Sequence, residues 1–362
     1  MKKAKNWRSV PDGRIVKEVW QYILEHSAQV AQCIILLLQE IRRTGKVPKR
    51  WHVSQTAQLD KNNEKAGTKA VRLINMLCPM GKGFYKLLWE TAQVRKHHFA
   101  YGFQAHRRRE QAILVQNVCT WRLREAARCS KGEHKKDFAH ITTYRDVANA
   151  FPSPKTEVLD RTVARALKGQ DAALVKQRHR ETYMTISTNQ GDWVMVKTGC
   201  GGMQGDAIMP GVFGCMYERL TKKVLAKRQD RGAVLLAKDP LTGKKLDVGT
   251  TSFADDIAET KLARDAAEMK FEIAQSNTEM EVELQRAGMG QNTSKAVHII
   301  HVTGKDAAAT IEDVKQWSTD QGLGKVCSKE RYLGNIKEDH GGRKANVQRR
   351  IACAKECWYS MR

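Results

Sequence analysis

Residues 250–260, TTSFADDIAET, constrain the fold of this 362-residue chain more than any other segment. Two adjacent aspartates, Asp255 and Asp256, stand between apolar and β-branched residues, a pattern that predicts two short strands joined by a tight turn. Because side chains alternate across a strand, one aspartate can point into a site while its neighbour supports it. Aspartate is also common in ordinary turns, so this pair alone does not define a site.

A third carboxylate stands at the end of another strand pattern. Asp146 closes the strand expected over residues 140–147. Carboxylates gathered at strand ends repel one another, and a divalent cation such as Mg²⁺, which prefers oxygen ligands, offsets that cost. Two such ions, about 3.5–4 Å apart, can activate a primer hydroxyl and stabilise a departing pyrophosphate. If the three aspartates meet in space, they suit phosphoryl transfer.

The rest of the chain alternates helical patterns with short hairpins. Apolar residues at helical spacing predict a helix over residues 15–43, stopped by Thr44-Gly45, and others over 155–167, 210–227 and 261–287. Strands are expected over residues 71–77, 182–188, 192–197 and 296–302, with polar loops over 61–69 and 131–136. Helices mixed with antiparallel hairpins predict an α+β fold rather than a doubly wound sheet.

The charge balance favours a polyanionic partner. Lys and Arg number 63 against 39 Asp and Glu, which gives a formal net charge of +24. Neutralising phosphates releases condensed counterions, so this excess favours nucleic acid, although basic proteins of other kinds share it. The clusters at residues 107–109 and 176–180 are the expected phosphate contacts.

Other classes of protein are disfavoured. The longest apolar run, residues 33–38, is too short to span a bilayer, so no membrane partner is expected. The nine cysteines form no C-x-x-C pair, which predicts buried free thiols in a reducing, intracellular compartment, the nucleus included, rather than a zinc ribbon or disulfide framework. No G-x-x-x-x-G-K-[ST] motif indicates a P-loop.

Taken in order, the motifs of the chain resemble the reverse transcriptases of non-LTR (LINE-type) retrotransposons and, more distantly, group II intron proteins. The similar segments are TGKVPKRW, KAVRLINML, YGFQAHRRREQAI, DVANAF, GGMQGDAIMPGVF, FADD, GMGQNTSKAVHI and YLGNI. The resemblance covers nearly the whole chain, from about residue 19 to its end. The order of the motifs carries the resemblance, since none of them is decisive alone.

The resemblance implies a right-hand polymerase fold. Fingers with N-terminal helices would occupy residues 1–140, a palm with an antiparallel sheet backed by helices residues 141–340, and the start of a thumb helix residues 341–362. The implied activity is that of an RNA-directed DNA polymerase, part of a retrotransposon polyprotein, which extends a primer by two-metal nucleotidyl transfer. Its cofactor would be Mg²⁺ or Mn²⁺. Its partners would be an RNA template, a DNA primer and deoxynucleoside triphosphates, with the oligomeric state left open.

The family's catalytic roles carry over to the aspartates. Asp146 and Asp255 would ligate both metal ions, the carbonyl of Val147 would assist, and Asp256 would be a supporting carboxylate. Each carboxylate would otherwise be an ordinary strand-end or turn residue.

The nucleotide-binding roles fall on five residues, Arg72, Phe151, Gln204, Gly205 and Lys295. Arg72 would grip the triphosphate, because its guanidinium is always charged. Phe151 would stack under the sugar and exclude a 2′-hydroxyl. Gln204 and Gly205 would let the chain approach the incoming base pair, and Lys295 would neutralise the leaving pyrophosphate.

Two further sets of residues would contact the nucleic acid. Tyr332, Leu333 and Gly334 correspond to the primer grip, and Phe103 and Arg107 to a template contact.

Departures from the family pattern keep a second interpretation open. Among them, Pro152, Ala207 and Met209 stand where the family usually has Asp, Pro and Ser. The alternative is a degenerate relative that binds nucleic acid without catalysis. A third, an RNA-templated RNA polymerase, also has palm carboxylates, but Phe151 as a sugar gate speaks against it.

Overall fold

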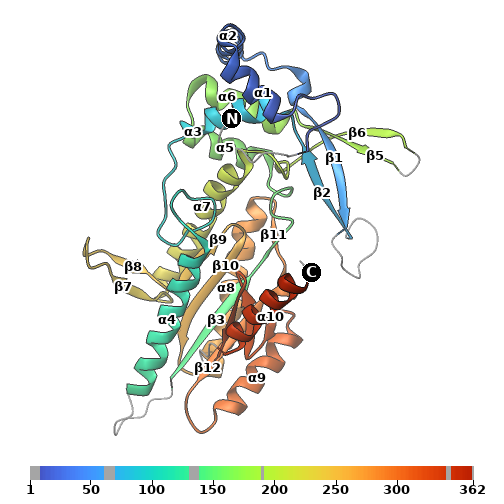
Figure 1. Ribbon diagram of the computed structural model, residues 1–362. Coiled ribbons are helices and arrows are strands. Elements are labelled where there is room, and N and C mark those ends of the chain that lie inside the picture. Colours follow the sequence, from blue (N-terminus) through green and yellow to red (C-terminus); the bar gives the residue numbers. More distant parts are fainter. Residues whose placement is uncertain (1–8, 61–69, 130–137, 189–190, 340–343, 361–362) are drawn as a thin grey trace. The chain divides into compact units, whose positions relative to one another are not determined.

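The computed structural model describes residues 9–60, 70–129, 138–188, 191–339 and 344–360 (Figure 1). The loops expected over residues 61–69 and 131–136 lie outside the described residues. Within the described ranges the chain has ten α-helices and sheets in which antiparallel pairing predominates, so the α+β class is confirmed. The chain forms two compact units, Met1–Arg95 with Asn149–Met216, and Lys96–Ala148 with Tyr217–Arg362. The division into fingers, palm and thumb stays a prediction.

The sheet of the first unit has four strands in the order β2-β1-β5-β6. Their bounds are β1 Val53–Asp60, β2 Val71–Met76, β5 Tyr183–Ser187 and β6 Trp193–Lys197. β1 and β5 are parallel, and the outer pairs are antiparallel. The strand at residues 71–77 and the hairpin at 182–197 are therefore confirmed.

The helix expected over residues 15–43 is two helices, α1 Lys17–His26 and α2 Ala28–Thr44. Ser27 separates them, because its backbone is extended and its hydroxyl accepts a hydrogen bond from the Val30 amide as the N-cap of α2. The predicted stop is confirmed, since Gly45 follows α2 with a φ of 72°.

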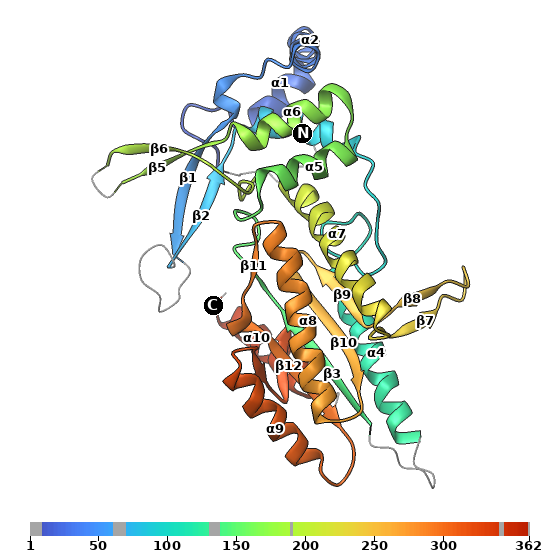
Figure 2. The same cartoon turned by 180° about the vertical axis from the view of Figure 1, so that it is seen from behind.

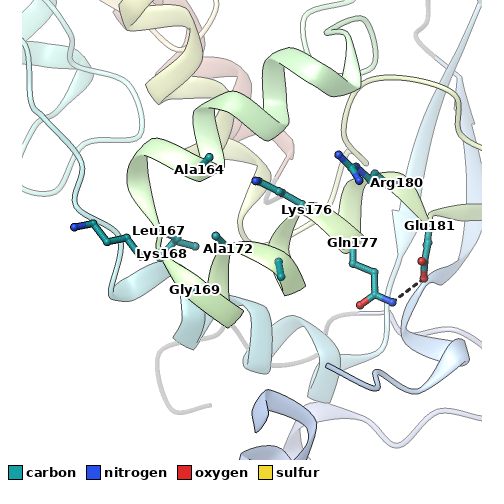
Figure 3. A pocket seen from close by; sticks show the side chains of 10 residues that line it. Ala164, Leu167, Lys168, Gly169, Ala172, Lys176, Gln177, Arg180 and Glu181 are labelled. Atoms are coloured by element: carbon teal, nitrogen blue, oxygen red, sulfur yellow. Dashed lines mark hydrogen bonds between the residues drawn. The ribbon is translucent and has the colours of Figure 1, made fainter. Parts of the chain in front are cut away.

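The remaining helices of the first unit come before, between and after the strands of its sheet. They are η1 Lys49–Trp51, α3 Pro79–Glu90, α5 Thr156–Ala166, α6 Gly169–Arg180 and the start of α7, Met209–Asp230. The helices expected over residues 155–167 and 210–227 are thus confirmed, whereas α6 was not predicted. A surface groove of about 620 Å³ lies along α5 and α6 (Figure 3).

A five-stranded sheet in the order β13-β12-β3-β10-β9 forms the centre of the second unit. Its strands are β3 Ala139–Arg145, β9 Thr250–Phe253, β10 Asp256–Ala263, β12 Val297–Val302 and β13 Lys325–Val326. Every residue of the central strand β3 is buried. The two threonines of β3 form hydrogen bonds across the sheet: Thr142 Oγ1 lies 3.0 Å from Thr260 Oγ1, and Thr143 Oγ1 lies 2.9 Å from His298 Nδ1.

Helices cover both faces of this sheet (Figure 2). On one face lie α8 Ala266–Arg286 and α9 Ala307–Asp320. They share a buried apolar cluster of Ala139, Ile141, Ala263, Met269, Ile273, Ile300, Val314 and Val326. On the other face lie α4 Arg109–Cys129 and the hairpin of β14 Lys329–Tyr332 and β15 Asn335–Glu338.

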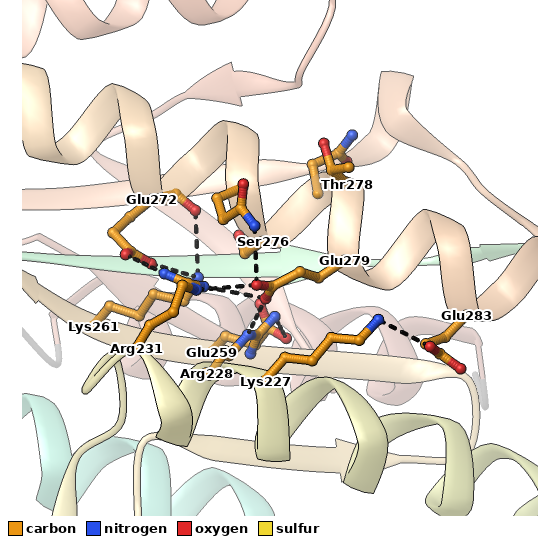
Figure 4. A network of polar contacts seen from close by, with 12 residues as sticks. Lys227, Arg228, Arg231, Glu259, Lys261, Glu272, Ser276, Thr278, Glu279 and Glu283 are labelled. Carbon is orange, nitrogen blue, oxygen red and sulfur yellow. Dashed lines mark hydrogen bonds and ion pairs between the residues drawn. The ribbon is translucent and has the colours of Figure 1, made fainter.

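The helix expected to begin at residue 261 begins later. β10 continues to Ala263, with Lys261 paired to Ile141 of β3, and α8 starts after Asp265, whose carboxylate accepts a hydrogen bond from the Glu268 amide. Lys261 instead joins a buried ion network between β10, α7 and α8 (Figure 4). Cross-strand pairing has outweighed the helical pattern at this position.

Shorter elements complete the second unit. They are β4 Val147–Ala148 with β11 Gly290–Gln291, β7 Leu236–Lys238 with β8 Lys245–Asp247, η3 Thr293–Lys295 and α10 Lys344–Ser360. No helix among the described residues is long and apolar enough to cross a membrane.

The cysteines that the structure describes are free thiols, as expected, but they are not all buried: Cys33, Cys129, Cys200 and Cys353 are exposed.

Candidate active site

The two adjacent aspartates lie in the turn between β9 and β10. Phe253 pairs with Asp256, so Ala254 and Asp255 form a two-residue loop. Ala254 has a φ of 58°, which a residue with a side chain adopts only at a cost. Gly102 packs against this loop so closely that a Cβ at Gly102 would lie 2.0 Å from the Ala254 nitrogen. A glycine at this position therefore allows the turn to form.

The structure brings Asp146 to the same end of the sheet. The ladder between β3 and β10 runs to the pair Arg145–Ile257. The next residues on the two strands are Asp146 and Asp256. Asp146, which is distant in sequence from the other two aspartates, therefore lies at the same end of adjacent strands as Asp255 and Asp256.

The carboxylates are close enough to perturb one another. Burial raises the pKa of Asp255, and the negative charge of Asp146 raises it further. Burial, Asp255 and Asp146 together raise the pKa of Asp256 to about 7. Lys295 opposes both shifts. A cation that approaches these two half-buried carboxyl groups would therefore stabilise their charged forms.

Lys295 is fixed beside these groups by the backbone. β4 pairs with β11, with Val147 opposite Gln291, and the Asn292 amide donates to the Asp146 carbonyl at 2.9 Å. η3 then places the Lys295 ammonium 2.8 Å from Asp146 Oδ2. The predicted pyrophosphate partner and the first predicted metal ligand therefore form an ion pair in this structure.

Two further buried residues form hydrogen bonds next to the carboxylates, and neither was predicted from the sequence to belong to the site. Tyr217 of α7 is almost fully buried and its hydroxyl donates to the Asp255 carbonyl at 3.3 Å. Arg145, next to Asp146, is buried and donates to Glu259 and to Ser276. The only sequence signals were an arginine inside a strand pattern and a tyrosine on the apolar face of a predicted helix.

The predicted nucleotide-binding residues other than Lys295 belong to the first unit, where one loop connects them. The Gly202 amide donates to the Phe151 carbonyl at 2.8 Å, and the Gln204 carbonyl accepts from the amide of Asn75 at 3.1 Å. Asn75 lies on β2, the strand that carries Arg72. Loop 199–206 is therefore hydrogen-bonded both to Phe151, the predicted sugar gate, and to β2, the strand that carries Arg72.

Side chains in this group differ in accessibility. Arg72, Gln204 and Gly205 are exposed, and Gly205 has a φ of 107° that favours glycine. Phe151 is half-buried against the ring of Phe213, with 4.9 Å between the ring centroids. This contact holds one side of the Phe151 ring in the core.

The predicted primer grip is a tight hairpin turn. Leu333 and Gly334 both have positive φ, as a two-residue turn between β14 and β15 requires. Tyr332 is buried, and its ring lies 4.8 Å from that of Tyr144, two residues before Asp146. The turn is thus packed against the strand that carries the first carboxylate.

The predicted template residues Phe103 and Arg107 lie in the loop before α4. Phe103 is exposed, with a φ of 57°. The Arg107 guanidinium donates to the carbonyls of His97 and Ala100 and lies over the Tyr101 ring. Arg107 therefore stabilises its own loop, and its contact with a template stays a prediction.

The donor set at the carboxylates fits a divalent cation in its chemistry, because hard oxygen ligands repel one another there. The side chains are not gathered around one point: within the described ranges, no three or more His, Cys, Asp or Glu side chains are placed to hold a metal ion. Asp146 is paired with Lys295 instead. The Lys295 ammonium thus contacts one oxygen of the Asp146 carboxylate, Oδ2, at 2.8 Å.

Neither a scan against protein-family models nor a search of curated proteins gave a match. Among solved structures, the chain is similar to an apo telomerase from Candida tropicalis truncated from its C-terminal domain, with a TM-score of 0.49 and 12% identity over 85% of this chain and 60% of that one. It is also similar to apo telomerase from the same organism, with a TM-score of 0.47 and 10% identity over 90% of this chain and 54% of that one.

A third similar structure is telomerase from Candida tropicalis in complex with a TWJ fragment of telomeric RNA. Its TM-score is 0.44, with 11% identity over 79% of this chain and 45% of that one. The chain spans about half the length of these three structures. At TM-scores below 0.5, the likeness assigns neither a family nor an activity to this chain.

Proposed function

We propose that this chain is an RNA-directed DNA polymerase, similar to the reverse transcriptases of LINE-type elements, that extends a primer by two-metal nucleotidyl transfer. One observation carries the proposal: Asp146 and the Asp255-Asp256 turn, distant in sequence, share one end of the β3–β10 pair. Turn propensity explains a single Asp-Asp pair but not the meeting of three carboxylates. The order of the sequence motifs supports the same activity.

In this proposal Asp146, Asp255 and the Val147 carbonyl hold Mg²⁺ or Mn²⁺, and Asp256 supports them. The bound ions would activate the primer 3′-hydroxyl and stabilise the departing pyrophosphate. Lys295, released from Asp146, would neutralise the charge of that pyrophosphate. Tyr217 keeps the Asp255 backbone in place through its hydrogen bond to the carbonyl.

The first unit would hold the incoming deoxynucleotide. Arg72 is exposed and has the permanent charge that a triphosphate requires. Gln204 and Gly205 would lie along the new base pair. The Phe151 ring, held by Phe213, would stand against the sugar and leave no room for a 2′-hydroxyl. The assignment of fingers, palm and thumb to residues 1–140, 141–340 and 341–362 belongs to this proposal.

A second candidate function is nucleic-acid binding without catalysis. One observation favours it: Asp146, a proposed metal ligand, forms an ion pair with the Lys295 ammonium. In a degenerate relative this ion pair would persist, and the basic surface would still bind nucleic acid.

Primer extension on poly(rA)/oligo(dT) with Mg²⁺ or Mn²⁺ separates the two candidates. We expect the unmodified chain to extend the primer and Asp255→Asn to lose extension while its affinity for the hybrid is kept. Asp320→Asn is the matched control, because Asp320 is exposed at the end of α9. Hybrid binding without extension by the unmodified chain would support the binding function and contradict the polymerase.

A further inference from the structure

The groove along α5 and α6 is not used by the proposed polymerase site. Its volume is about 620 Å³, and small residues make up much of its lining: Ala164, Gly169, Ala172 and Ala173. The one large apolar residue among the ten that line it, Leu167, is buried. The groove therefore offers an open channel without a pocket for an apolar side chain.

The charged residues of the lining are mainly basic. Lys168 lies at one end, and Lys176 and Arg180 follow one another by a helical turn on α6. Figure 3 shows Lys176 extending toward Ala164, while Gln177 points toward Glu181. Gln177 donates to Glu181 at 2.9 Å, which ties the one acidic side chain of the lining to its own helix.

Two of these cations are available to a ligand. Neither the Lys168 ammonium nor the Lys176 ammonium has an ion-pair or hydrogen-bond partner within the part of the chain that the structure describes. Arg180 contacts Asp160 through Nε and Nη2, and the remaining N–H groups of its exposed guanidinium are free to donate elsewhere. Three positive charges thus line one open groove.

The basic side chains of the cluster at residues 176–180 differ in burial. Arg178 is buried and donates to Asp206 at 2.9 Å and to the Trp51 carbonyl at 2.6 Å. His179 is buried as well, and burial lowers its pKa to about 4. Only Lys176 and Arg180 of the cluster can therefore meet a ligand, and both line the groove.

We propose that this groove binds the sugar–phosphate backbone of a single nucleic-acid strand without reading its bases. Its free ammonium groups match phosphates, and its Ala and Gly floor admits a backbone. None of the lining residues is aromatic, so base stacking has no partner there. An acidic peptide is disfavoured because the groove has no recess for an apolar anchor. The inference stands on this groove alone and does not require catalysis.

The test is the affinity of the whole chain for fluorescein-labelled oligo(U), measured by fluorescence anisotropy over a range of salt concentrations. Lys168→Glu/Lys176→Glu reverses the two free charges. Lys222→Glu/Lys305→Glu is the matched control, with the same change of net charge at exposed lysines outside the groove. We expect the groove variant to bind at least about tenfold more weakly than the control at low salt.

The slope of log K against log[salt] for the groove variant should be shallower than that for the control by about 1.4, since each single-strand phosphate contact contributes about 0.7.

Equal affinities and slopes for the groove variant and its control would overturn the proposal. A strong preference for oligo(U) over oligo(A) would also contradict it, because a backbone contact reads no bases. Displacement of RNA by polyglutamate at matched charge would assign the groove to acidic polymers instead. The anisotropy assay requires no nucleotide addition, so a failure of the polymerase proposal would leave this result unchanged. Melting curves of the groove variant and its control are recorded alongside, to check that both are folded.

Discussion

The buried ion network behind the proposed active site makes Glu259→Gln a strongly destabilising substitution. Glu259 of β10 is 1% exposed, accepts a hydrogen bond from Arg145 and forms an ion pair with Arg228, whose Nη2 lies 2.5 Å away. Both arginines are buried too. Burial alone would raise the pKa of Glu259, but the two arginines outweigh it and lower the pKa to about 2. Glu259 is therefore an anion at neutral pH.

Replacing this carboxylate by an amide leaves the buried Arg145 guanidinium without its counter-charge, and it leaves Arg228 with only Glu279, 3.6 Å away. Removing one partner of a buried pair costs about 3–5 kcal/mol, and we expect the lower end because glutamine still accepts one hydrogen bond. For a unit of about 200 residues, this corresponds to a decrease in Tm of about 6–12 °C. Differential scanning calorimetry measures it directly.

The matched control for this substitution is Glu312→Gln. Glu312 pairs with Lys315 on the surface of α9, and both side chains are largely exposed. Surface pairs of this kind contribute little, so no measurable shift of Tm is expected. If Glu259→Gln melted within a degree or so of the unmodified chain, the network would not be stabilising, and the argument from burial and charge would be wrong.

Three further predictions concern the site and its surroundings. Gly102→Ala should abolish primer extension, because its Cβ would lie 2.0 Å from the Ala254 nitrogen, whereas Gly83→Ala, with nothing within 4 Å, should extend normally. Phe151→Val should retain deoxynucleotide incorporation while its discrimination against ribonucleotides, measured as a ratio of kcat/KM, falls at least about tenfold; unchanged selectivity would make Phe151 a core residue only. Burial lowers the pKa of His298 to about 4, so the unfolded chain binds a proton near pH 6.5 that the folded chain binds only near pH 4. The stability that the neutral His298 contributes is complete above pH 6.5, and the unfolding free energy should fall by about 3 kcal/mol on this account by pH 4. If the unfolding free energies of the unmodified chain and His298→Gln depended on pH in the same way, this prediction would be contradicted.

The sequence predicted those parts of the site that depend on local pattern. The Asp255-Asp256 turn and the strand that ends at Asp146 follow from alternation and turn chemistry, and register then brings them together. The supports of the site depend on tertiary contacts that no local pattern contains. Gly102 and Tyr217 reach the turn from distant segments.

The errors in secondary structure have similar causes. Ser27 divides the first helix because its hydroxyl caps α2, a role that a continuous apolar pattern conceals. Lys261 lies in a strand because it pairs with β3 and because its ammonium, 3.4 Å from Glu272, has a buried partner. The basic cluster at residues 176–180 was expected to contact phosphates, yet Arg178 is an internal ion-pair residue. In each case a partner far away in sequence decided the local conformation or exposure.

The central claim is that Asp146, Asp255 and Asp256 act together in nucleotidyl transfer. It is tested most directly by the single-turnover rate of dTMP addition to oligo(dT) on poly(rA) as Mg²⁺ is titrated, for the unmodified chain, Asp146→Asn and Asp320→Asn. The account predicts a rate that saturates with Mg²⁺ for the unmodified chain and Asp320→Asn, and that falls at least about a hundredfold in Asp146→Asn with hybrid affinity unchanged. Incorporation by Asp146→Asn at the rate of the unmodified chain would contradict the claim.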